Sequence, residues 1–354
     1  MSAEMTRAAP EPRTGGSALL DPSTDPRWQR FVHAAHGAMI FHHPAWLGLI
    51  RRRYGYPVAA CCTLDGAGHV TAGLPLALVR RPPRGRRLVA FPFSDVCPPI
   101  GTTAGMSELG RAVADLGHRT GTPVEVRGAL PGAQQGAQYF RHVLPLAPQI
   151  GEVERQFTRS SVMRGVRRAR REGLVAERRT DADALDGFYR LHLVTRSRLG
   201  APTQPRAFIR DLEALFRQGL GFVLTIRRDG GPTVAAAVFL HHGGVLTYKY
   251  GASDPRALGM RPNNLLFWEA IRWGCEHEMT ALDLGRSDLE QRSLCEFKRS
   301  WGAEEQLLEY VHVGPGAPRA ADRGVLGRTL AAGLRRTPPV ASRLVGEVLY
   351  RYAG

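Results

Sequence analysis

The chain contains almost no lysine: Lys249 and Lys298 are the only two lysines among its 48 lysines and arginines. It has no apolar run of about eighteen residues, so the sequence predicts no transmembrane helix. No apolar segment near the N-terminus marks a secretory signal. The five cysteines include no C-x-x-C pair, which favours a reduced, cytoplasmic protein with buried thiols. The twelve histidines show no zinc-type spacing, so we expect no metal.

The net charge of +16 is large. Two interpretations stay open. Such a charge favours acidic partners, namely phosphates, nucleic acid or an anionic membrane surface. It is also what an arginine-rich chain with an ordinary solvated surface would carry.

The length suggests two domains at about 150 residues each. Residues 1–26 are rich in Pro, Ala, Gly and Ser and are expected to be disordered. Residues 27–150 and 151–314 share a rough plan of helices, a hairpin and a strand-loop-helix-strand unit, which indicates duplication. We therefore predict a mixed α/β chain of two domains, followed by a basic and helical tail over residues 315–354.

The segment 245–304 is the most informative. Its pattern reads as a strand (245–250), a polar loop, a helix, a short strand (280–284) and a turn (285–288). We expect Asn263 or Asn264 to cap the helix, which would begin just after Pro262. A helix N-terminus beside strand ends is a common place to bind a phosphate or a carbonyl oxygen.

Several short motifs occur along the chain in a characteristic order. They are FHHPAW (41–46), LPL (74–76), PFSD (92–95), RSRLG (196–200), YKYGASD (248–254), RPNNLLFWEAI (261–271), LDLGRS (282–287) and FKRSWGAE (297–304). Together they resemble the Fem-type branch of the GNAT acyltransferase superfamily, including the CelD/BioF-like acetyltransferases. The resemblance implies two tandem GNAT-like domains, each a central mixed sheet flanked by helices. It also implies transfer of an acyl or aminoacyl group to an amine of a small molecule or a cell-envelope precursor.

The resemblance leaves two donors open, because Fem proteins proper use aminoacyl-tRNA and many relatives use an acyl-CoA. GNAT enzymes hold the CoA pyrophosphate with a Gln/Arg-x-x-Gly-x-Gly/Ala loop before a helix. Here Arg256 and Gly259 match that pattern, whereas Arg261 replaces the small residue. Backbone amides can still form an anion nest, and Arg261 can contact a phosphate directly. The cofactor-binding candidates are Arg256, Gly259, Arg261, Asn263 and Asn264.

Acyl transfer to an amine needs a neutral amine, a polarised carbonyl and close positioning. The sequence has no G-x-S-x-G elbow and no evident Cys-His pair, so we expect direct attack by the amine. Lys298 is predicted to place positive charge at a phosphate or at the developing oxyanion, unless it is an exposed helix lysine. Cys295, which lies nearby, is interpreted as a buried thiol rather than a nucleophile.

Three more residues complete the catalytic candidates. Tyr248 and Tyr250 alternate with Lys249, so the lysine and the tyrosines are expected on opposite faces of a strand. Each tyrosine is either a general acid for the leaving group or a core residue. Asp283 either anchors the substrate cleft or pairs with Arg286.

The substrate-binding candidates are Arg286, Ser287, Ser94, Asp95, Arg196, Arg198 and Lys249. The first two follow a strand, which is a good position for substrate contact. Ser94 and Asp95 of the first domain either follow a strand in the same way or cap a helix. Arg196 and Arg198 either contact anionic groups of a substrate or are simply solvated. The arginine run at 164–171 likewise either contacts an anionic substrate or tRNA or is solvated. Lys249 alternatively faces solvent.

Two other classes of function stay open: a nucleic-acid or anion-binding module, and a scaffold without activity. The charge supports the first, although the chain lacks a zinc finger or an aromatic-basic single-strand platform. The basic tail is expected to lie against the body or, reversibly, on an anionic membrane surface. Nothing in the sequence indicates an oligomeric state.

Overall fold

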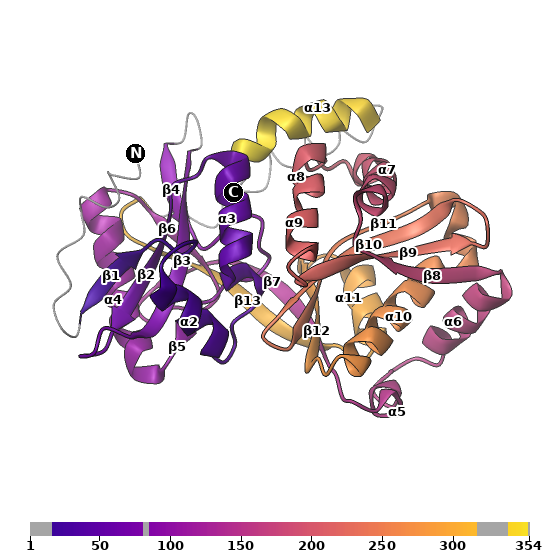
Figure 1. Ribbon diagram of the computed structural model, residues 1–354, viewed down its shortest axis with the longest axis horizontal. Coiled ribbons are helices and arrows are strands. Elements are labelled where there is room, and N and C mark those ends of the chain that lie inside the picture. Colours follow the sequence, from indigo (N-terminus) through magenta and orange to yellow (C-terminus); the bar gives the residue numbers. More distant parts are fainter. Residues whose placement is uncertain (1–15, 81–84, 317–338, 353–354) are drawn as a thin grey trace. The chain divides into compact units, whose positions relative to one another are not determined.

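The computed structural model describes residues 16–80, 85–316 and 339–352 (Figure 1). The chain forms two compact units, which we describe separately. The first unit comprises residues 1–139, 308–322 and 351–354, and the second unit comprises residues 140–307 and 323–350. The units thus divide at Tyr139 and Leu308, whereas the sequence placed the boundaries at Gly151 and after residue 314.

The first unit is a mixed sheet with helices. Its strands follow the order β1-β2-β3-β4-β6-β13-β7, and β5 pairs with β3. They are β1 (Ser17–Leu20), β2 (Val58–Leu64), β3 (Val70–Arg80), β4 (Arg86–Val89), β5 (Ile100–Gly101), β6 (Val124–Arg127) and parts of β7 (Gln134–Pro145) and β13 (Glu304–Val313). The helices are α2 (Pro26–Ala34), η1 (Ile40–His42), α3 (Pro44–Tyr54) and α4 (Thr103–Thr120).

Local signals in the sequence explain the bounds of α4. The Thr102 side chain accepts a hydrogen bond from the Gly105 backbone N–H and so caps the N-terminus. Gly121 ends the helix in the left-handed conformation, with φ of 58°. The inward face of α4, which carries Leu109 and Val113, packs in one core with Leu74 and other residues of the sheet.

The second unit has the strand order β7-β12-β11-β10-β9-β8. Its further strands are β8 (Leu174–Arg179), β9 (Gly221–Arg228), β10 (Thr233–His242), β11 (Val245–Ser253) and β12 (Ala281–Ser287). Its helices are α5 (Ile150–Glu154), α6 (Ser161–Arg171), α7 (Ala182–Leu199), α8 (Arg206–Asp211), α9 (Glu213–Phe216), η2 (Pro255–Met260), α10 (Pro262–Glu276), α11 (Arg292–Ser300) and α13 (Pro339–Leu349), which η4 (Tyr350–Tyr352) follows.

Helices cover both faces of the second sheet (Figure 1). Helix α10 contacts β8 to β12 and α6 on one face, and α7 contacts β9 to β11, α8 and α13 on the other. Residues Leu266 and Ile271 of α10 belong to the same buried core as Phe239 of β10. The apolar spacing in 265–273 therefore marks the face of α10 that packs on the sheet.

The two units repeat one topology. In each, three antiparallel pairings lead to a fourth strand, which pairs parallel with a fifth across one helix. These parallel pairs are β4–β6 around α4 and β11–β12 around α10. The sixth strand comes from the other half of the sequence: β7 pairs antiparallel with β12, and β13 pairs antiparallel with β6. The mixed α/β fold of two duplicated units is thus confirmed.

Several local expectations need correction. The segment 285–288 is not a simple turn, because β12 continues through it to Ser287. Neither asparagine caps α10: the helix begins at Pro262, and Arg261 is its N-cap. The expected disorder over residues 1–26 does not hold for Ser17–Leu20, which pair with β2.

The apolar residues expected to form a tail helix, at 325–334, lie outside the described residues. Further along the tail, α13 begins at Pro339 and contacts α7. Ser342 of α13 lies 3.1 Å from the hydroxyl of Thr203. Within the described ranges, no helix combines the length and apolar character needed to cross a bilayer.

Candidate active site

The parallel strands β11 and β12 separate part of the way along their length. They pair only at Val245↔Ala281, Leu246↔Leu282 and Thr247↔Asp283. Beyond the last pair, β11 continues to Ser253 and stays paired with β10, while β12 continues to Ser287 and stays paired with β7. The facing backbone edges of the two strands therefore have no ladder partner among the described strands. Such an edge can accept an extended chain that carries amide groups.

A β-bulge lies where the strands separate. Tyr248 is opposite Phe239 and Tyr250 is opposite Val238, so Lys249 is the extra residue. Because neighbouring residues of β10 point to opposite faces, the bulge places the two tyrosines on opposite faces as well. The expectation that both tyrosines share one face was wrong for this reason.

Tyr248 belongs to the α10 face of the sheet. Its ring lies 5.6 Å from that of Phe239 and 5.0 Å from that of Phe267. Burial raises the pKa of its hydroxyl to about 12. A Cβ at Gly251 would lie only 1.6 Å from that hydroxyl oxygen, so a glycine is needed there. These contacts make Tyr248 a packing residue.

Tyr250 belongs to the α7 face. Its ring lies 5.9 Å from that of His192 in α7, and the Lys249 ammonium lies 4.8 Å from the ring centre. The His192 Nε2 lies 2.6 Å from the Gln204 side-chain oxygen, and burial lowers the pKa of His192 to about 3. Tyr250 therefore has both a neutral aromatic neighbour and a cation close to its ring.

The segment between β11 and α10 is shaped by its own side chains. The Asp254 carboxylate accepts the Arg256 backbone N–H at 2.9 Å and also pairs with the Arg256 guanidinium at 2.9 Å. Arg261 adopts a left-handed φ of 61° at the start of α10 and is exposed. A Cβ at Gly259 would meet no atom within 4 Å, so this glycine borders open space.

The two asparagines lie in the first turn of α10 and are half-buried. Asn264 donates from its side-chain amide to the Val162 carbonyl of α6 at 3.4 Å. The same amide lies 2.6 Å from where a Cβ at Gly165 would be, so α6 and α10 are in close contact at this end. The structure thus places all five cofactor-binding candidates in one continuous segment, residues 256–264.

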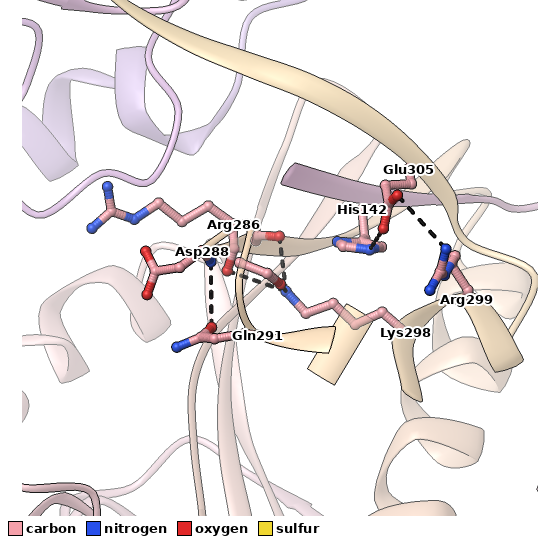
Figure 2. Close-up of polar contacts among 9 residues, drawn as sticks. His142, Arg286, Asp288, Gln291, Lys298, Arg299 and Glu305 are labelled. Carbon is pink, nitrogen blue, oxygen red and sulfur yellow. Dashed lines mark hydrogen bonds and ion pairs between the residues drawn. The ribbon is translucent and has the colours of Figure 1, made fainter. Parts of the chain in front are cut away.

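Lys298 is buried and holds β12 in place. Its Nζ donates to the Gly285 carbonyl at 3.0 Å, to the Arg286 carbonyl at 3.2 Å and to the Ser287 hydroxyl at 2.9 Å (Figure 2). An ammonium group has three N–H donors, and these three acceptors match them. Lys298 is therefore not the exposed helix lysine of the alternative reading, and its geometry suits positioning of β12.

Asp283 also stabilises β12, and its ion-pair partner is Arg141 rather than the expected Arg286. The Arg141 guanidinium donates to its carboxylate at 2.8 and 3.0 Å, and the Gly285 backbone N–H donates at 2.8 Å. Arg286 is not the ion-pair partner: it is exposed, and its guanidinium points away from Lys298 (Figure 2). Arg141 was not a candidate from the sequence because it lies 142 residues from Asp283 along the chain.

A cluster that sequence reasoning missed lies on the other side of Lys298. A ring nitrogen of His142, the Cys295 Sγ and a carboxylate oxygen of Glu305 all lie within 4.8 Å of one another. His142 Nε2 is 3.0 Å from Glu305 Oε2 (Figure 2). Burial, together with the nearby Lys298 charge, lowers the pKa of His142. Only Cys295 had been singled out, because no spacing links these three residues.

The remaining candidates belong to other elements of the chain. Arg196 donates to the Pro202 carbonyl at 3.0 Å and supports the segment after α7, and Arg198 is exposed. Ser94 and Asp95 belong to the first unit. Arg127 donates to the Ser94 carbonyl, and the Tyr310 hydroxyl donates to the Asp95 carbonyl at 2.6 Å.

Comparison with known proteins places this geometry in a family. Residues 156–299 match the acetyltransferase (GNAT) domain family. The chain therefore carries a GNAT domain in its second unit, and the expected GNAT-type acyltransferase is confirmed as the class of protein. No curated protein sequence matches the chain.

Solved structures show how far the fold extends. FemX aligns over 81% of this chain and 96% of its own, with 15% identity and a TM-score of 0.60. The C-terminal domain of a putative lysylphosphatidylglycerol synthetase from Agrobacterium fabrum aligns over 89% and 96%, with 14% identity and a TM-score of 0.56. Saccharomyces cerevisiae N-myristoyltransferase with bound myristoyl-CoA aligns over 86% and 83%, with 10% identity and a TM-score of 0.50. At such identities the likeness concerns the fold, which is that of Fem-like and other GNAT proteins.

Proposed function

We propose that the second unit transfers an acyl group from an acyl-CoA to an amine, with direct attack by the amine. The observation that carries this proposal is the separation of β11 and β12 after Thr247 and Asp283, with a bulge at Lys249. The open strand edges lead towards the segment 256–264, at the start of α10. An extended donor with amide groups at one end and phosphates at the other matches that order of binding groups.

Each end of the donor has its own binding groups. The N-terminus of α10 carries the positive end of the helix dipole, so it suits a pyrophosphate. The exposed guanidinium of Arg261 adds a fixed positive charge at the same place. At the other end, the Lys249 ammonium lies at the bulge beside Tyr250 and supplies positive charge for the thioester oxygen.

We assign the proton-transfer role to Tyr250 rather than Tyr248. The Tyr248 hydroxyl lies over Gly251 among the rings of the α10 face, where burial opposes its ionisation. Tyr250 is half-buried, as Tyr248 is, but it differs in having a lysine ammonium over its ring. In this proposal Tyr250 gives its proton to the leaving thiolate, while the attacking amine loses one proton to solvent. Lys298 and Asp283 act as positioning residues, because both bind β12 itself.

The acceptor in this proposal is an amine of a small molecule or of a cell-envelope precursor. The resemblance to the Fem-like branch supports such an acceptor. The exposed Arg286, on the strand beyond the separation point, is suited to an anionic group of it. The proposal places the reaction in the cytoplasm.

A second donor is favoured by one observation. Helix α6 packs against α10 and presents exposed arginines, among them Arg167 and Arg171, on the face away from the core. A cationic helix beside the donor site suits an RNA backbone, so aminoacyl-tRNA is the alternative donor. Two of the similar structures, FemX and the putative lysylphosphatidylglycerol synthetase domain, make this alternative worth testing.

The test offers the purified chain a set of acyl-CoAs and, separately, aminoacyl-tRNAs, with a panel of amines and envelope precursors. A mass increase of the acceptor equal to the acyl group identifies the donor. Tyr250→Phe is expected to lower kcat about 100-fold, in the range expected for loss of one proton donor. The matched Tyr248→Phe variant should keep wild-type kcat. Equal effects of the two substitutions, or no transfer from any donor, would contradict the proposal.

A further inference from the structure

We propose that His142, Cys295 and Glu305 bind one zinc ion in the second unit. These residues come from β7, α11 and β13, and one ligand atom from each lies within 4.8 Å of the other two. Imidazole nitrogen, thiolate sulfur and carboxylate oxygen are the three donor types that zinc takes in proteins. The site lies outside the separated strands where we place the acyl donor, and its existence does not depend on the proposed function.

The spacing and burial suit a bound ion. His142 Nε2 and Glu305 Oε2 are 3.0 Å apart, close to the separation of about 3.3 Å that zinc bond lengths give to two tetrahedral ligands. The Cys295 Sγ lies within 4.8 Å of both other ligand atoms. His142 and Cys295 have exposed fractions of 0% and 3%, so water competes little for these two ligands.

The cluster keeps one side accessible to solvent. The Glu305 side chain is 22% exposed, which leaves a path to solvent for the fourth ligand, a water molecule.

Two cationic side chains lie near the cluster, and each has partners of its own. The Arg299 guanidinium lies 3.8 Å from Glu305 Oε1, which leaves Oε2 for the ion. Lys298 directs its ammonium to two carbonyls and a hydroxyl of β12. When zinc binds, the Cys295 thiol gives its proton to solvent, and thiolate and carboxylate together neutralise the ion.

The consequence is a connection between the ion and the candidate active site. Cys295 and Lys298 lie one turn apart on the same face of α11. An ion that ties Cys295 to β7 and β13 would fix this turn, and Lys298 would then hold the carbonyls of β12 in place. Zinc is thus inferred to position β12 rather than to contact the reacting groups.

The experiment uses the full chain, freed of metal with a chelator, loaded with zinc and dialysed. We expect about one zinc per chain in the wild type and in Cys275→Ser, a matched control because Cys275 is another buried thiol of this unit, outside the cluster. Cys295→Ala should retain less than a tenth of that amount. Glu305→Gln, at a partly exposed position, tests the site if Cys295→Ala does not fold.

Cobalt gives a second measurement, made on the wild type and on the Cys275→Ser control. A thiolate bound to Co²⁺ produces a charge-transfer absorption, which is expected in the wild type and in Cys275→Ser. Absence of that band in the wild type would overturn the proposal, as would equal zinc content in wild type and Glu305→Gln. Loss of zinc with unchanged acyl transfer would separate this site from the proposed function.

Discussion

Replacing Lys298 with Met tests whether this lysine positions β12 or acts on the substrate. Methionine keeps most of the buried volume but offers no donor. The Gly285 carbonyl and the Ser287 hydroxyl are bonded in buried surroundings, whereas the Arg286 carbonyl is partly accessible to water. A hydrogen bond from a charged donor contributes about 1.5–3 kcal/mol. The two buried bonds alone therefore predict a loss of about 3–6 kcal/mol in the free energy of unfolding.

The assay is urea unfolding followed by tryptophan fluorescence, since Trp268, Trp273 and Trp301 all lie in the second unit. The matched control is Arg292→Met, which removes a cation from the exposed surface of the same helix. It should change the unfolding free energy by less than about 0.5 kcal/mol. The midpoint should move for Lys298→Met and stay in place for the control.

Two results would refute this reasoning. One is a loss of less than about 1 kcal/mol in Lys298→Met, because the three bonds would then contribute little. The other is a variant that keeps wild-type stability yet loses about 100-fold in kcat, the effect of removing an oxyanion donor. That second outcome would return Lys298 to the catalytic role that its motif first suggested.

Two further predictions concern the neighbours of the candidate site. Burial lowers the pKa of His192 to about 3, so the unfolded chain takes up its proton first, and stability is lost as pH falls below about 6.5. Between pH 7 and pH 5 this effect lowers the free energy of unfolding by about 2 kcal/mol. In urea titrations at the two pH values, the free energy of unfolding of His192→Gln should fall by about 2 kcal/mol less than that of the wild type. Equal losses in the two proteins would contradict the assignment. Gly251→Ala should cost about 1–3 kcal/mol through the clash with the Tyr248 hydroxyl, and adding Tyr248→Phe should recover part of it. Simple additivity of these two substitutions would argue against the clash.

Much of the fold could be predicted because its signals are local. Helix caps such as Thr102, the left-handed Gly121 and the two-residue alternation of strands are encoded within a few neighbouring residues. The repeated order of helices, hairpin and parallel pair is visible for the same reason. The position of the candidate cofactor-binding segment follows directly from its motif, which is continuous in sequence.

What could not be predicted depends on partners that are far apart in sequence. The bulge at Lys249 arises because β11 shifts register against β10. The sequence of β11 alone does not indicate this shift. Likewise, the Arg141–Asp283 pair joins β7 to β12. The boundaries at Gly151 and residue 314 differ from those of the compact units because β7 and β13 each complete the sheet of the other half.

The duplication itself shows why we place the reaction in the second unit. In the first unit the equivalent strands β4 and β6 also pair only briefly, at Leu88↔Val124 and Val89↔Glu125. There the chain fills the space itself: Cys97 bridges to Arg127, and the Arg127 guanidinium donates to the carbonyls of Phe91 and Ser94. A segment tied to β6 in this way occupies the edge that a donor would need. In the second unit no described strand pairs with the corresponding edge of β12, where Lys298 and Asp283 bind backbone groups of Gly285 and Arg286 instead.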